Sequence, residues 1–358
     1  MLDVMHFHPS EKMSNLFVAP LLNMESKSNI KSKLIVSNNK KDGIKFSLSI
    51  HNLLTLPFAF FRLLKIIKTN SPKVVIAHNT TSAFLPLLAA KVCGVKHIIY
   101  FNHGVPYIGH FGITKMALKT LERINLRLCT EALTVSSDMI RFLRKISNKT
   151  ISLINNGSAC GITLSKNKTD KNKYRESLGF KDTDFLVAFI GRPEKRKGYH
   201  FSITVWEKFF ANKPGFKFLV YGGNNEIKHL KSREINNIFF MGFENDINKV
   251  LTSIDCMILP SLHEGLSYVT LEATLAQCPL ICSSVPGLRL IIKNNKNGLM
   301  VNRDYASYAK AIKSLQIRKL DAHTQEKYSK ELYRKYNRDD FSRAYIKFLK
   351  ERIYITNP

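Results

Sequence analysis

The chain has 358 residues, 44% of them hydrophobic, and its 55 Lys and Arg against 27 Asp and Glu give a formal net charge of +28. This length accommodates two domains, and the hydrophobic fraction excludes a largely disordered chain. The charge has two open explanations: an overall usage rich in Lys, Asn and Ile, or attraction to an anionic membrane surface or a polyphosphate ligand. Nucleic acid is disfavoured as a partner, because no known nucleic-acid motif is found and aromatic residues do not alternate with basic ones.

The six cysteines include no CxxC pair and lie mostly in apolar runs, which favours reduced, buried thiols in a cytosolic protein over a metal site. The first twelve residues, "MLDVMHFHPSEK", carry charges and histidines and no signal-peptide core. No uncharged apolar run reaches the ~18 residues that a membrane span needs. The apolar segment 53–68 carries three cations, and it is either a core-facing helix or a helix lying on an anionic bilayer.

The first half alternates between apolar, β-rich runs and stretches with helical spacing. A polar, charged stretch at 166–184 follows, which indicates a linker with a short helix. The expected strands are 2–7, 32–37, 73–77, 97–101, 131–135 and 150–154, and the expected helices are 55–68, 81–92, 114–128 and 137–145.

The second half repeats this alternation more clearly and ends in a charged, aromatic and helical tail at 321–358. Such alternation predicts parallel sheets with helices on both faces. We expect an α/β chain with two doubly wound, Rossmann-like domains, 1–165 and 166–325, and a C-terminal helix within 326–358 that packs back on the first domain. The expected strands are 185–191, 216–223, 237–242, 255–260 and 279–284, and the expected helices are 199–211, 246–253 and 268–277.

In doubly wound sheets, ligands bind at the carboxyl ends of the strands, so we expect site residues in the turns that follow the strands. One such turn lies in "LPSLHEGLSYVTLEATLAQCPLICSSVPG", residues 259–287. Gly265 permits a sharp turn and a close ligand approach. The free amides of Gly265, Leu266 and Ser267 at a helix N-terminus would suit a diphosphate. Ser267 is alternatively only a helix N-cap.

The same stretch contains two glutamates eight residues apart, Glu264 and Glu272. A carboxylate beside an anion site would repel phosphate, so Glu264 makes better sense as an acceptor of hydrogen bonds from sugar hydroxyls. Glu272 lies about two helical turns later on the same side, where it could accept both hydroxyls of a ribose. Two isolated glutamates at this spacing would ordinarily be solvated surface charges, but the strand, glycine turn and helix around them favour a site.

A second turn, "FIGRPEKRKGYHF" at 189–201, follows the first strand of the second half. Cations in a glycine-bounded loop suit phosphate, with Arg as a bidentate fork and Lys as a point charge. The loop is otherwise a solvated basic turn. It is neither a Walker P-loop nor a GxGxxG fingerprint, which disfavours ATP hydrolysis and NAD chemistry. Its relevant residues are Gly191, Arg192, Lys195, Arg196, Lys197 and Gly198.

At these residues the sequence resembles the family 4 retaining glycosyltransferases of GT-B fold, whose two Rossmann-like domains face a central cleft. The motifs that carry the resemblance are "GRPEKRKG" (191–198), "MGFENDINKVLTSIDCMILPSLHEGLSYVTLEA" (241–273) and "PLICSSVPGLRLIIKNNKNGLMV" (279–301). The first half adds "FNHGVPYIGHFG" (101–112), "LER" (121–123), "TVSSDM" (134–139) and "NNGSACGI" (155–162). The resemblance extends over nearly the whole chain and is closest to bacterial members that build capsule, O-antigen or related surface polysaccharides.

The resemblance implies roles for particular residues. Arg192 and Lys197 would neutralise the donor diphosphate, and Glu264 would hold the donor sugar beside the amides of Gly265, Leu266 and Ser267. Glu272 would bind the ribose of the nucleotide. On the acceptor side, His103 and Gly104 in "NHG" would face the sugar or the acceptor, although a lone histidine is more often structural. The implied catalytic set is Glu264, His103, Arg192 and Lys197, and the implied donor-binding set is Gly191, Arg192, Lys197, Glu264, Gly265, Leu266, Ser267 and Glu272.

The sequence departs from the family pattern in two places. Many members open with a glycine-rich loop near the N-terminus, whereas "FHPSEKMSNLFVAP" (7–20) has no glycine. Many also carry Asp in an NG-x-D segment, whereas "NNGSACGIT" ends with Thr163. No role transfers to these two segments.

The implied reaction is transfer of a hexose or N-acetylhexosamine from a nucleoside-diphosphate sugar, such as a UDP-sugar, to a hydroxyl with retained configuration. We expect no metal ion and no cofactor, since the cations and the helix N-terminus would stabilise the leaving diphosphate. The acceptor would be a polyprenyl-diphosphate-linked saccharide, and the enzyme would be cytoplasmic and peripheral on the inner face of the cytoplasmic membrane. The alternatives are another GT-B enzyme, such as a sugar-nucleotide epimerase or a phosphorylase, and a non-catalytic nucleotide-sugar-binding protein.

Overall fold

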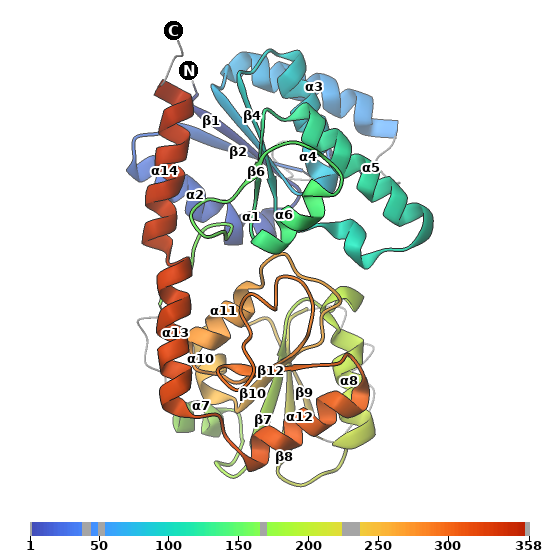
Figure 1. Cartoon of the computed structure of the whole chain (residues 1–358), viewed down its shortest axis with the longest axis vertical. Helices are drawn as coiled ribbons and strands as arrows, with labels where there is room; N and C mark the ends of the chain where they lie inside the picture. Colours follow the sequence, from blue (N-terminus) through green and yellow to red (C-terminus); the bar gives the residue numbers. More distant parts are fainter. Residues whose placement is uncertain (1, 38–43, 49–53, 165–169, 224–236, 355–358) are drawn as a thin grey trace. The chain divides into compact units, whose positions relative to one another are not determined.

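The computed structural model describes residues 2–37, 44–48, 54–164, 170–223 and 237–354 (Figure 1). The chain forms two compact units, and each is described by itself. The first comprises Met1–Gly161 and Tyr336–Pro358, and the second comprises Ile162–Lys335. The sequence placed the domain boundaries at 165/166 and 325/326, and the first of these positions lies outside the described residues.

The first unit is built on a six-stranded, wholly parallel sheet of strand order β2-β1-β3-β4-β5-β6. Figure 1 shows this sheet between α2 and α14 on one side and α3, α4 and α5 on the other. Its elements are β1 (Val4–His8), α1 (Glu11–Phe17), α2 (Ala19–Lys27), β2 (Ser32–Val36), α3 (Leu56–Asn70), β3 (Val74–His78), α4 (Thr80–Val92), β4 (His97–Asn102), η2 (Pro106–Gly109), α5 (Gly112–Leu128), β5 (Glu131–Thr134), α6 (Ser137–Arg144), β6 (Ile151–Ser152) and α14 (Arg338–Tyr354).

The second unit has a six-stranded parallel sheet of order β12-β11-β10-β7-β8-β9. Helices α8 and α12 pack together on one face, and α10 contacts α7 and α11. Its elements are α7 (Lys171–Ser177), β7 (Phe185–Ile190), η3 (Lys195–Lys197), α8 (Tyr199–Phe209), β8 (Phe216–Tyr221), β9 (Ile238–Gly242), α10 (Ile247–Ser253), β10 (Cys256–Leu259), α11 (Tyr268–Leu275), β11 (Leu280–Ser283), β12 (Gly298–Val301), α12 (Tyr305–Ile317) and α13 (Ala322–Tyr336).

The central strands are buried on both faces, as expected for parallel sheets covered by helices. All residues of β1, β3 and β7 are buried, which explains why these segments are continuous apolar runs in the sequence. In the second unit, Trp206 of α8 stacks on Phe210 and on Phe218 of β8. The predicted α/β class with two doubly wound parallel sheets is confirmed.

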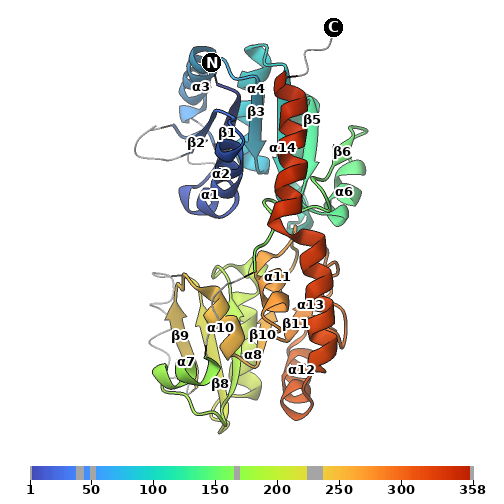
Figure 2. The same ribbon diagram turned by 90° about the vertical axis from the view of Figure 1, so that its left-hand side faces the viewer.

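The C-terminal helix α14 belongs to the first unit, although the chain reaches it only after completing the second. It contacts α2, and Figure 2 shows it running along the sheet of this unit. Phe341, Tyr345, Leu349 and Ile353 are buried at four-residue intervals, so one helical face packs inward. Among the described residues, no helix is both long enough and apolar enough to cross a bilayer.

Candidate functional site

The two turns singled out from the sequence leave neighbouring strands of the second unit. Strands β7 and β10 pair in register, although β8 and β9 lie between them in the chain. From β7 the chain adds strands β8 and β9 on one side, and from β10 it adds β11 and β12 on the other. The connections that follow β7 and β10 therefore lead away from each other. In open α/β sheets this switch point is where ligands bind. The turn 191–198 follows β7 and the turn 260–267 follows β10.

Glycines bring the backbones of these turns into contact. Gly198 has φ +80°, and a Cβ there would lie 2.4 Å from the carbonyl oxygen of Pro260. Gly287 has φ +79°, and its Cβ would lie 2.5 Å from the carbonyl oxygen of Glu264. The amide of Leu262 donates to the carbonyl of Arg196 at 2.8 Å. A side chain at Gly198 would force apart the two turns that carry the predicted site residues, and one at Gly287, in the segment after β11, would collide with the turn that carries Glu264.

Glu264 lies at the centre of this region with its carboxylate buried. It accepts hydrogen bonds from Lys197 Nζ at 2.8 Å, Ser261 Oγ at 2.8 Å and Arg196 at 3.3 Å. Burial alone would raise the pKa of Glu264, but the Lys197 and Arg196 charges and the hydrogen bonds from Lys197 and Ser261 lower it below its usual value. The carboxylate is therefore ionised and fixed in place.

A second carboxylate extends the ion-pair network outward. Glu194 pairs with Arg192 at 2.6 Å and with Arg196 at 3.3 Å. Arg196 thus joins Glu194 to Glu264, whereas Arg192 pairs with the outer carboxylate, Glu194, and its side chain is 53% exposed. The sequence analysis paired Arg192 with Lys197 and gave Arg196 no role. No local signal distinguishes these cations, because the choice depends on how the turn folds against β10.

The N-terminus of α11 lies directly after this carboxylate. Gly265 and Leu266 precede the helix and Ser267 occupies its N-cap position, but the Ser267 side chain makes no capping hydrogen bond. Its hydroxyl is buried without a partner among the described residues. Serine as a simple N-cap is therefore not what the structure shows. Glu272 lies in the second turn of α11 and is exposed.

Gly191 lies where β7 and β8 end side by side. Its amide donates to the carbonyl of Tyr221 at 3.1 Å. A Cβ on Gly222 would lie 2.0 Å from the Gly191 carbonyl oxygen, so the two strand ends approach as closely as their backbones allow. Gly191 thus fixes where the basic turn begins.

The first unit has a switch point of its own, between β1 and β3. Histidines stand at the carboxyl ends of the strands here: His8 ends β1, His78 ends β3, and His103 follows β4 directly. Asn79, after β3, has φ +63° and ψ +157°, a backbone conformation that is costly for any residue with a side chain. The predicted acceptor-side residue His103 therefore lies at this edge of the sheet.

The ring of His103, which is half-buried, ends a row of side chains that we call the histidine chain: the buried Glu25, His6 and His78, and His103. His103 Nε2 lies 2.8 Å from His78 Nδ1, and His78 Nε2 lies 3.1 Å from His6 Nδ1. His6 Nε2 lies 2.9 Å from Glu25 Oε1, which also accepts a hydrogen bond from the Tyr345 hydroxyl at 2.6 Å. The histidine chain connects β4, β3, β1 and α2, and Tyr345 joins it to α14.

Burial keeps most of these imidazoles neutral. It holds the pKa of His78 well below its usual value, and it lowers the pKa of His103 to about 3 and that of His8 to about 4. Burial would raise the pKa of Glu25, yet the charge of His6 and the hydrogen bonds from His6 and Tyr345 lower it. Within the described residues, no group of three or more His, Cys, Asp or Glu side chains is arranged to hold a metal ion.

The backbone beside His103 is held by a second buried network. The Gly104 amide donates to Asn102 Oδ1 at 3.0 Å, and Asn102 Nδ2 donates to Glu122 Oε1 at 3.0 Å. Glu122 also accepts from Thr80 Oγ1 at 2.6 Å and from the Tyr100 hydroxyl at 2.9 Å. Burial raises the pKa of Glu122 to about 7, and the hydrogen bonds from Thr80, Tyr100 and Asn102 offset only part of this effect.

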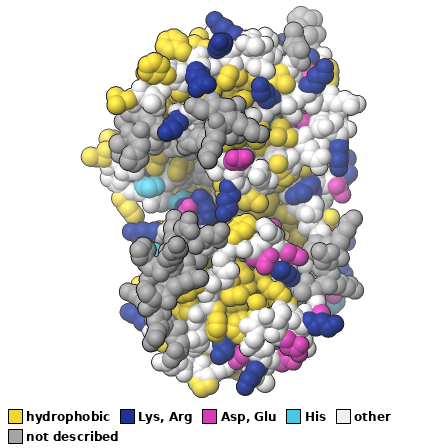
Figure 3. All heavy atoms as spheres, turned by 180° about the vertical axis from the view of Figure 1, so that it is seen from behind, with side chains coloured by type: hydrophobic (Ala, Val, Ile, Leu, Met, Phe, Trp, Pro, Cys, Tyr) yellow, Lys and Arg dark blue, Asp and Glu magenta, His cyan; other side chains and the backbone are white. Residues whose placement is uncertain are grey.

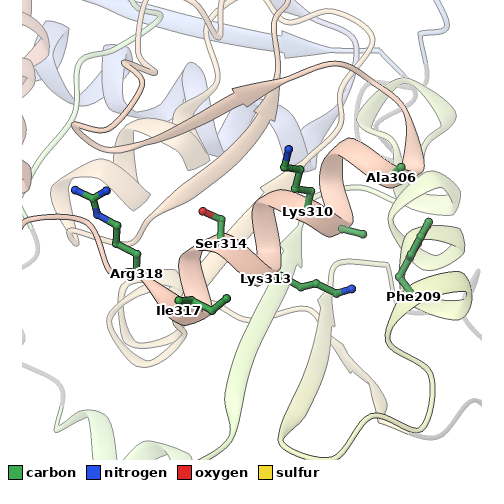
Figure 4. Close-up of a pocket in the computed structure, with 8 residues that line it drawn as sticks. Phe209, Ala306, Lys310, Lys313, Ser314, Ile317 and Arg318 are labelled. Atoms are coloured by element: carbon green, nitrogen blue, oxygen red, sulfur yellow. The ribbon is translucent and has the colours of Figure 1, made fainter.

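A surface pocket of about 460 Å³ lies between α8 and α12 (Figure 4). It is lined by Phe209 and by one side of α12, including Lys310, Lys313 and Arg318. None of its residues belongs to the turns at the switch point. This pocket is therefore distinct from the candidate site.

The two doubly wound parallel sheets, with polar turns gathered at their switch points, place the chain in the GT-B class of α/β enzymes. Two family models match it, "Glycosyltransferase Family 4" over residues 32–158 and "Glycosyl transferases group 1" over residues 170–335. The chain belongs to this family of glycosyltransferases, which confirms the resemblance seen in its motifs. It is a glycosyltransferase, and its relatives support the hexosyltransferase class.

The matched relatives include bacterial enzymes of surface-polysaccharide synthesis. The UDP-Gal:alpha-D-GlcNAc-diphosphoundecaprenol alpha-1,3-galactosyltransferase of Escherichia coli is 25% identical over 268 residues, which are 70% of this chain and 68% of the relative. The capsular polysaccharide biosynthesis glycosyltransferase CapM of Staphylococcus aureus is 21% identical over 268 residues, 72% and 70% of the two chains.

Solved structures match the fold over nearly the whole chain. The sucrose-phosphate synthase of Thermosynechococcus elongatus superposes with a TM-score of 0.81 at 16% identity and covers 98% of this chain and 99% of its own. Anabaena HepE in complex with UDP-glucose gives a TM-score of 0.75 at 14% identity, with 98% and 100% coverage. At these identities the likeness establishes the fold.

Proposed function

We propose that this chain is a retaining glycosyltransferase that transfers a hexose or N-acetylhexosamine from a nucleoside-diphosphate sugar to a lipid-linked saccharide. The proposal that the second unit binds the nucleoside-diphosphate sugar rests on one observation. Glu264 is buried and ionised between Lys197 and Arg196 at the switch point of the second unit. A fixed carboxylate among cations is suited to accept hydrogen bonds from sugar hydroxyls while the cations face a phosphate.

The charge balance of the network supports a diphosphate ligand. Three cations, Arg192, Arg196 and Lys197, are linked to two carboxylates, so the network retains a positive charge. Arg192 is exposed and its ion pair with Glu194 lies at the surface, so it can turn to a phosphate at small cost. The amides of Gly265, Leu266 and Ser267 and the unpartnered Ser267 hydroxyl add donors at the start of α11.

In the proposed reaction the bond between the anomeric carbon and the diphosphate oxygen breaks, and negative charge grows on the leaving diphosphate. Lys197, Arg192 and the amides at the start of α11 stabilise that charge. The acceptor hydroxyl attacks the same face of the sugar and its proton passes to a donor phosphate oxygen, so configuration is retained without an enzymatic nucleophile. Because cations already serve the leaving group, we propose that no metal ion is required.

On the first unit, we propose that His103 and Gly104 bind a hydroxyl of the transferred sugar or of the acceptor. Glu272 is the proposed partner of the nucleotide ribose, and its exposed position on α11 leaves its carboxylate accessible to a ligand. For the acceptor, the name of the Escherichia coli relative supports a saccharide joined to a polyprenyl diphosphate. The CapM relative supports a role in capsule, O-antigen or related polysaccharide synthesis.

Such an acceptor lies in a membrane, and the first unit presents a surface that suits one. Helix α3 packs inward through Ala59, Leu63 and Ile67, while Phe58 and Phe61 are 73% and 68% exposed. At the start of α5, Phe111, Ile113 and Met116 are exposed as well. Figure 3 shows hydrophobic side chains along the edge of this unit where α3 and α5 lie. The exposed cations Arg62, Lys65, Lys68 and Lys115 accompany them.

Exposed aromatic side chains next to cations suit the interface of an anionic bilayer. We therefore propose a peripheral, cytoplasmic enzyme that docks through α3 and the start of α5. Flotation with anionic liposomes tests this: wild type should float at low salt and less at high salt, and Phe58→Ser with Phe61→Ser should stay at the bottom. Equal flotation of wild type and variant would contradict the proposed surface.

The donor proposal is tested by a thermal-shift panel of nucleotides and nucleotide sugars with Mg²⁺ or with EDTA. We expect one nucleotide sugar to raise the melting temperature equally in both conditions. Lys197→Met should abolish this shift, whereas the control Lys313→Met, in the pocket beside α12, should retain it. A shift that requires Mg²⁺ would overturn metal independence, and a shift that depends on Lys313 instead of Lys197 would overturn the site.

A further inference from the structure

The histidine chain is buried, continuous and absent from the roles discussed so far, apart from its last member. Each of its three contacts holds one hydrogen between two electronegative atoms, at 2.9, 3.1 and 2.8 Å. These hydrogens cannot be chosen independently, because each neutral imidazole carries a proton on only one nitrogen. The tautomer of His103 is therefore tied to the protonation of groups that lie far from it along the chain.

Only two arrangements satisfy every contact while His78 and His103 stay neutral. The ionised Glu25 can only accept, so His6 donates from Nε2 in both. If His6 carries a second proton on Nδ1, His78 must accept at Nε2 and donate from Nδ1. His103 then accepts at Nε2, and its own proton lies on Nδ1.

If His6 is neutral, the sequence of donors and acceptors is reversed. His78 then donates from Nε2 to His6, and His103 donates from Nε2 to His78. Nδ1 of His103 then carries no proton and can only accept a hydrogen bond. One proton at His6 thus decides whether the far end of the histidine chain offers a hydrogen-bond donor or an acceptor.

Charge balance selects between the two arrangements. Glu25 and His6 are both fully buried, and a buried carboxylate without a countercharge is costly. Within the described residues, the charged or titratable groups around His6 are Glu25 from α2, His78 from β3, His8 on its own strand, and Tyr345 from α14 through Glu25. None of these except His6 can supply a positive charge, since burial keeps His8 and His78 neutral.

We propose that Glu25, His6 and His78 are positioning residues that fix His103 as the Nδ1–H tautomer, so that a neutral imidazole presents a hydrogen-bond donor to a ligand oxygen. The hydrogen bond to His78 is the one that His103 makes within the described part of the chain, which leaves Nδ1 for the ligand. The ligand class is a neutral hydroxyl or carbonyl oxygen, as on a sugar. The link to sugar transfer rests on the proposed function, whereas the tautomer does not.

Tyr345 extends this arrangement to the C-terminal helix. Its hydroxyl donates to the same Glu25 oxygen that faces His6, and burial together with Glu25 raises the pKa of Tyr345 well above its usual value. The phenol therefore stays protonated and helps to keep the carboxylate ionised. The packing of α14 on α2 thereby supports the ionised state of Glu25 at the start of the histidine chain.

The test is the tautomer of His103 read from its ring ¹⁵N chemical shifts in ¹⁵N-histidine-labelled full-length protein, with the signals assigned by loss in His103→Gln. Wild type should show a protonated Nδ1. In Glu25→Gln the His6 and His103 tautomers should change together: a glutamine oxygen that accepts from His6 Nε2 gives His103 as the Nε2–H tautomer, and a glutamine amide that donates to His6 Nε2 leaves it as Nδ1–H. A wild-type His103 protonated at Nε2, or a Glu25→Gln protein with neutral His6 protonated at Nε2 and His103 at Nδ1, would overturn the proposal.

The matched control is Glu131→Gln, which removes a carboxylate that lies beside His97 and pairs with Arg352 of α14, outside the histidine chain. It should leave the His103 signals unchanged, and a change there would contradict the proposal as well. Circular dichroism establishes that each variant is folded, and Tyr345→Phe, which keeps the Glu25 charge, provides a milder second variant that should retain the wild-type tautomer.

Transfer assays then connect the tautomer to function. With the nucleotide sugar identified by thermal shift, Glu25→Gln should lower kcat/KM at least tenfold, while Glu131→Gln should retain it. If wild type transfers no sugar from any donor, the proposed function fails but the tautomer result still stands. If Glu25→Gln reverses the tautomer and leaves kcat/KM unchanged, the positioning role is overturned.

Discussion

The two units carry their candidate residues at the same place in the fold and use opposite electrostatics there. At the switch point between β7 and β10, ionised side chains form a network of three cations and two carboxylates. At the switch point between β1 and β3, burial keeps His8, His78 and His103 neutral. The first arrangement suits a charged ligand, and the second suits the directional hydrogen bonds of an uncharged one.

The largest effect should come from removing the central charge of the second unit. Glu264→Gln leaves Lys197 and Arg196 without their buried partner and removes the proposed sugar contact. We expect the transfer rate to fall about a thousandfold, equivalent to ~4 kcal/mol in transition-state stabilisation. Nucleotide binding should persist, because the released cations still face the phosphates.

The measurement is kcat with the identified donor, beside the dissociation constant for its nucleotide. Glu176→Gln, an exposed carboxylate on α7, serves as the control and should behave as wild type. A Glu264→Gln enzyme with wild-type kcat would show that the charged network is structural and would remove the proposed difference between the units.

The next effect tests whether contact between the turns holds the charged network together. Gly198→Ala places a methyl group against the Pro260 carbonyl in a left-handed backbone conformation. We expect roughly 3 to 4 kcal/mol of destabilisation from strain and overpacking. Gly215→Ala is the matched control, since Gly215 has φ +75° with open space around it, and it should cost only about 1 kcal/mol. Urea unfolding of both variants gives the comparison, and equal losses would argue against the close approach of the turns.

A smaller effect should distinguish the two units by the pH dependence of the free energy of unfolding. Burial raises the pKa of Glu122 to about 7 from its ordinary value of 4.5, so between these pH values the folded chain binds more protons than the unfolded chain. Stability therefore falls as pH rises through this window, by at most about 3 kcal/mol from this group. Glu122→Gln should lack this contribution, so its stability relative to wild type should improve between pH 4.5 and pH 8.

Urea unfolding across this pH range provides the measurement. Glu176→Gln should retain the wild-type slope, because its carboxylate is exposed. A Glu122→Gln variant whose stability follows the wild-type pH dependence would indicate that Glu122 is ionised in the folded unit, as Glu264 is.

The smallest effect is expected on changing Arg192, the exposed cation at the outer end of the ion-pair network. Arg192→Gln removes an exposed ion pair and should change the free energy of unfolding by less than about 1 kcal/mol. Nucleotide affinity should nevertheless fall several-fold, and the salt dependence of binding should weaken. Titrations at low and high salt check this, and Lys195→Gln, which removes an exposed cation of the same turn, offers a comparison of equal charge. Unaltered affinity in Arg192→Gln would confine phosphate binding to the buried cations.

Much of the fold could be predicted because the buried strands are continuous apolar runs. The sequence did not predict strand β12, which has four residues, or helix α12 (Tyr305–Ile317), which contains no continuous apolar run. Helices α1 and α2 were not predicted from the sequence, because residues 7–20 were compared only with the glycine-rich loop of the family. Pro20, a residue type common in the first turn of a helix, lies at the start of α2.

The two turns of the second unit that carry the predicted site residues could be located in the sequence, because each lies between an apolar strand and a helix. Partners across turns could not, and Arg196 is the example. The histidine chain required knowledge of register, since β1 pairs with β3 and β3 with β4, so that histidines from distant segments meet. The available signal was a histidine at the end of each of these three strands.

The first unit is assembled from two pieces of chain separated by the whole of the second. During synthesis, the whole second unit, Ile162–Lys335, is therefore made after the first piece of the first unit and before α14 emerges and Tyr345 reaches Glu25. Until that moment the nascent sheet carries an uncovered surface beside α2 and lacks one donor to its buried carboxylate. The last segment of the chain to be made is thus the helix that completes the packing around the buried Glu25 carboxylate.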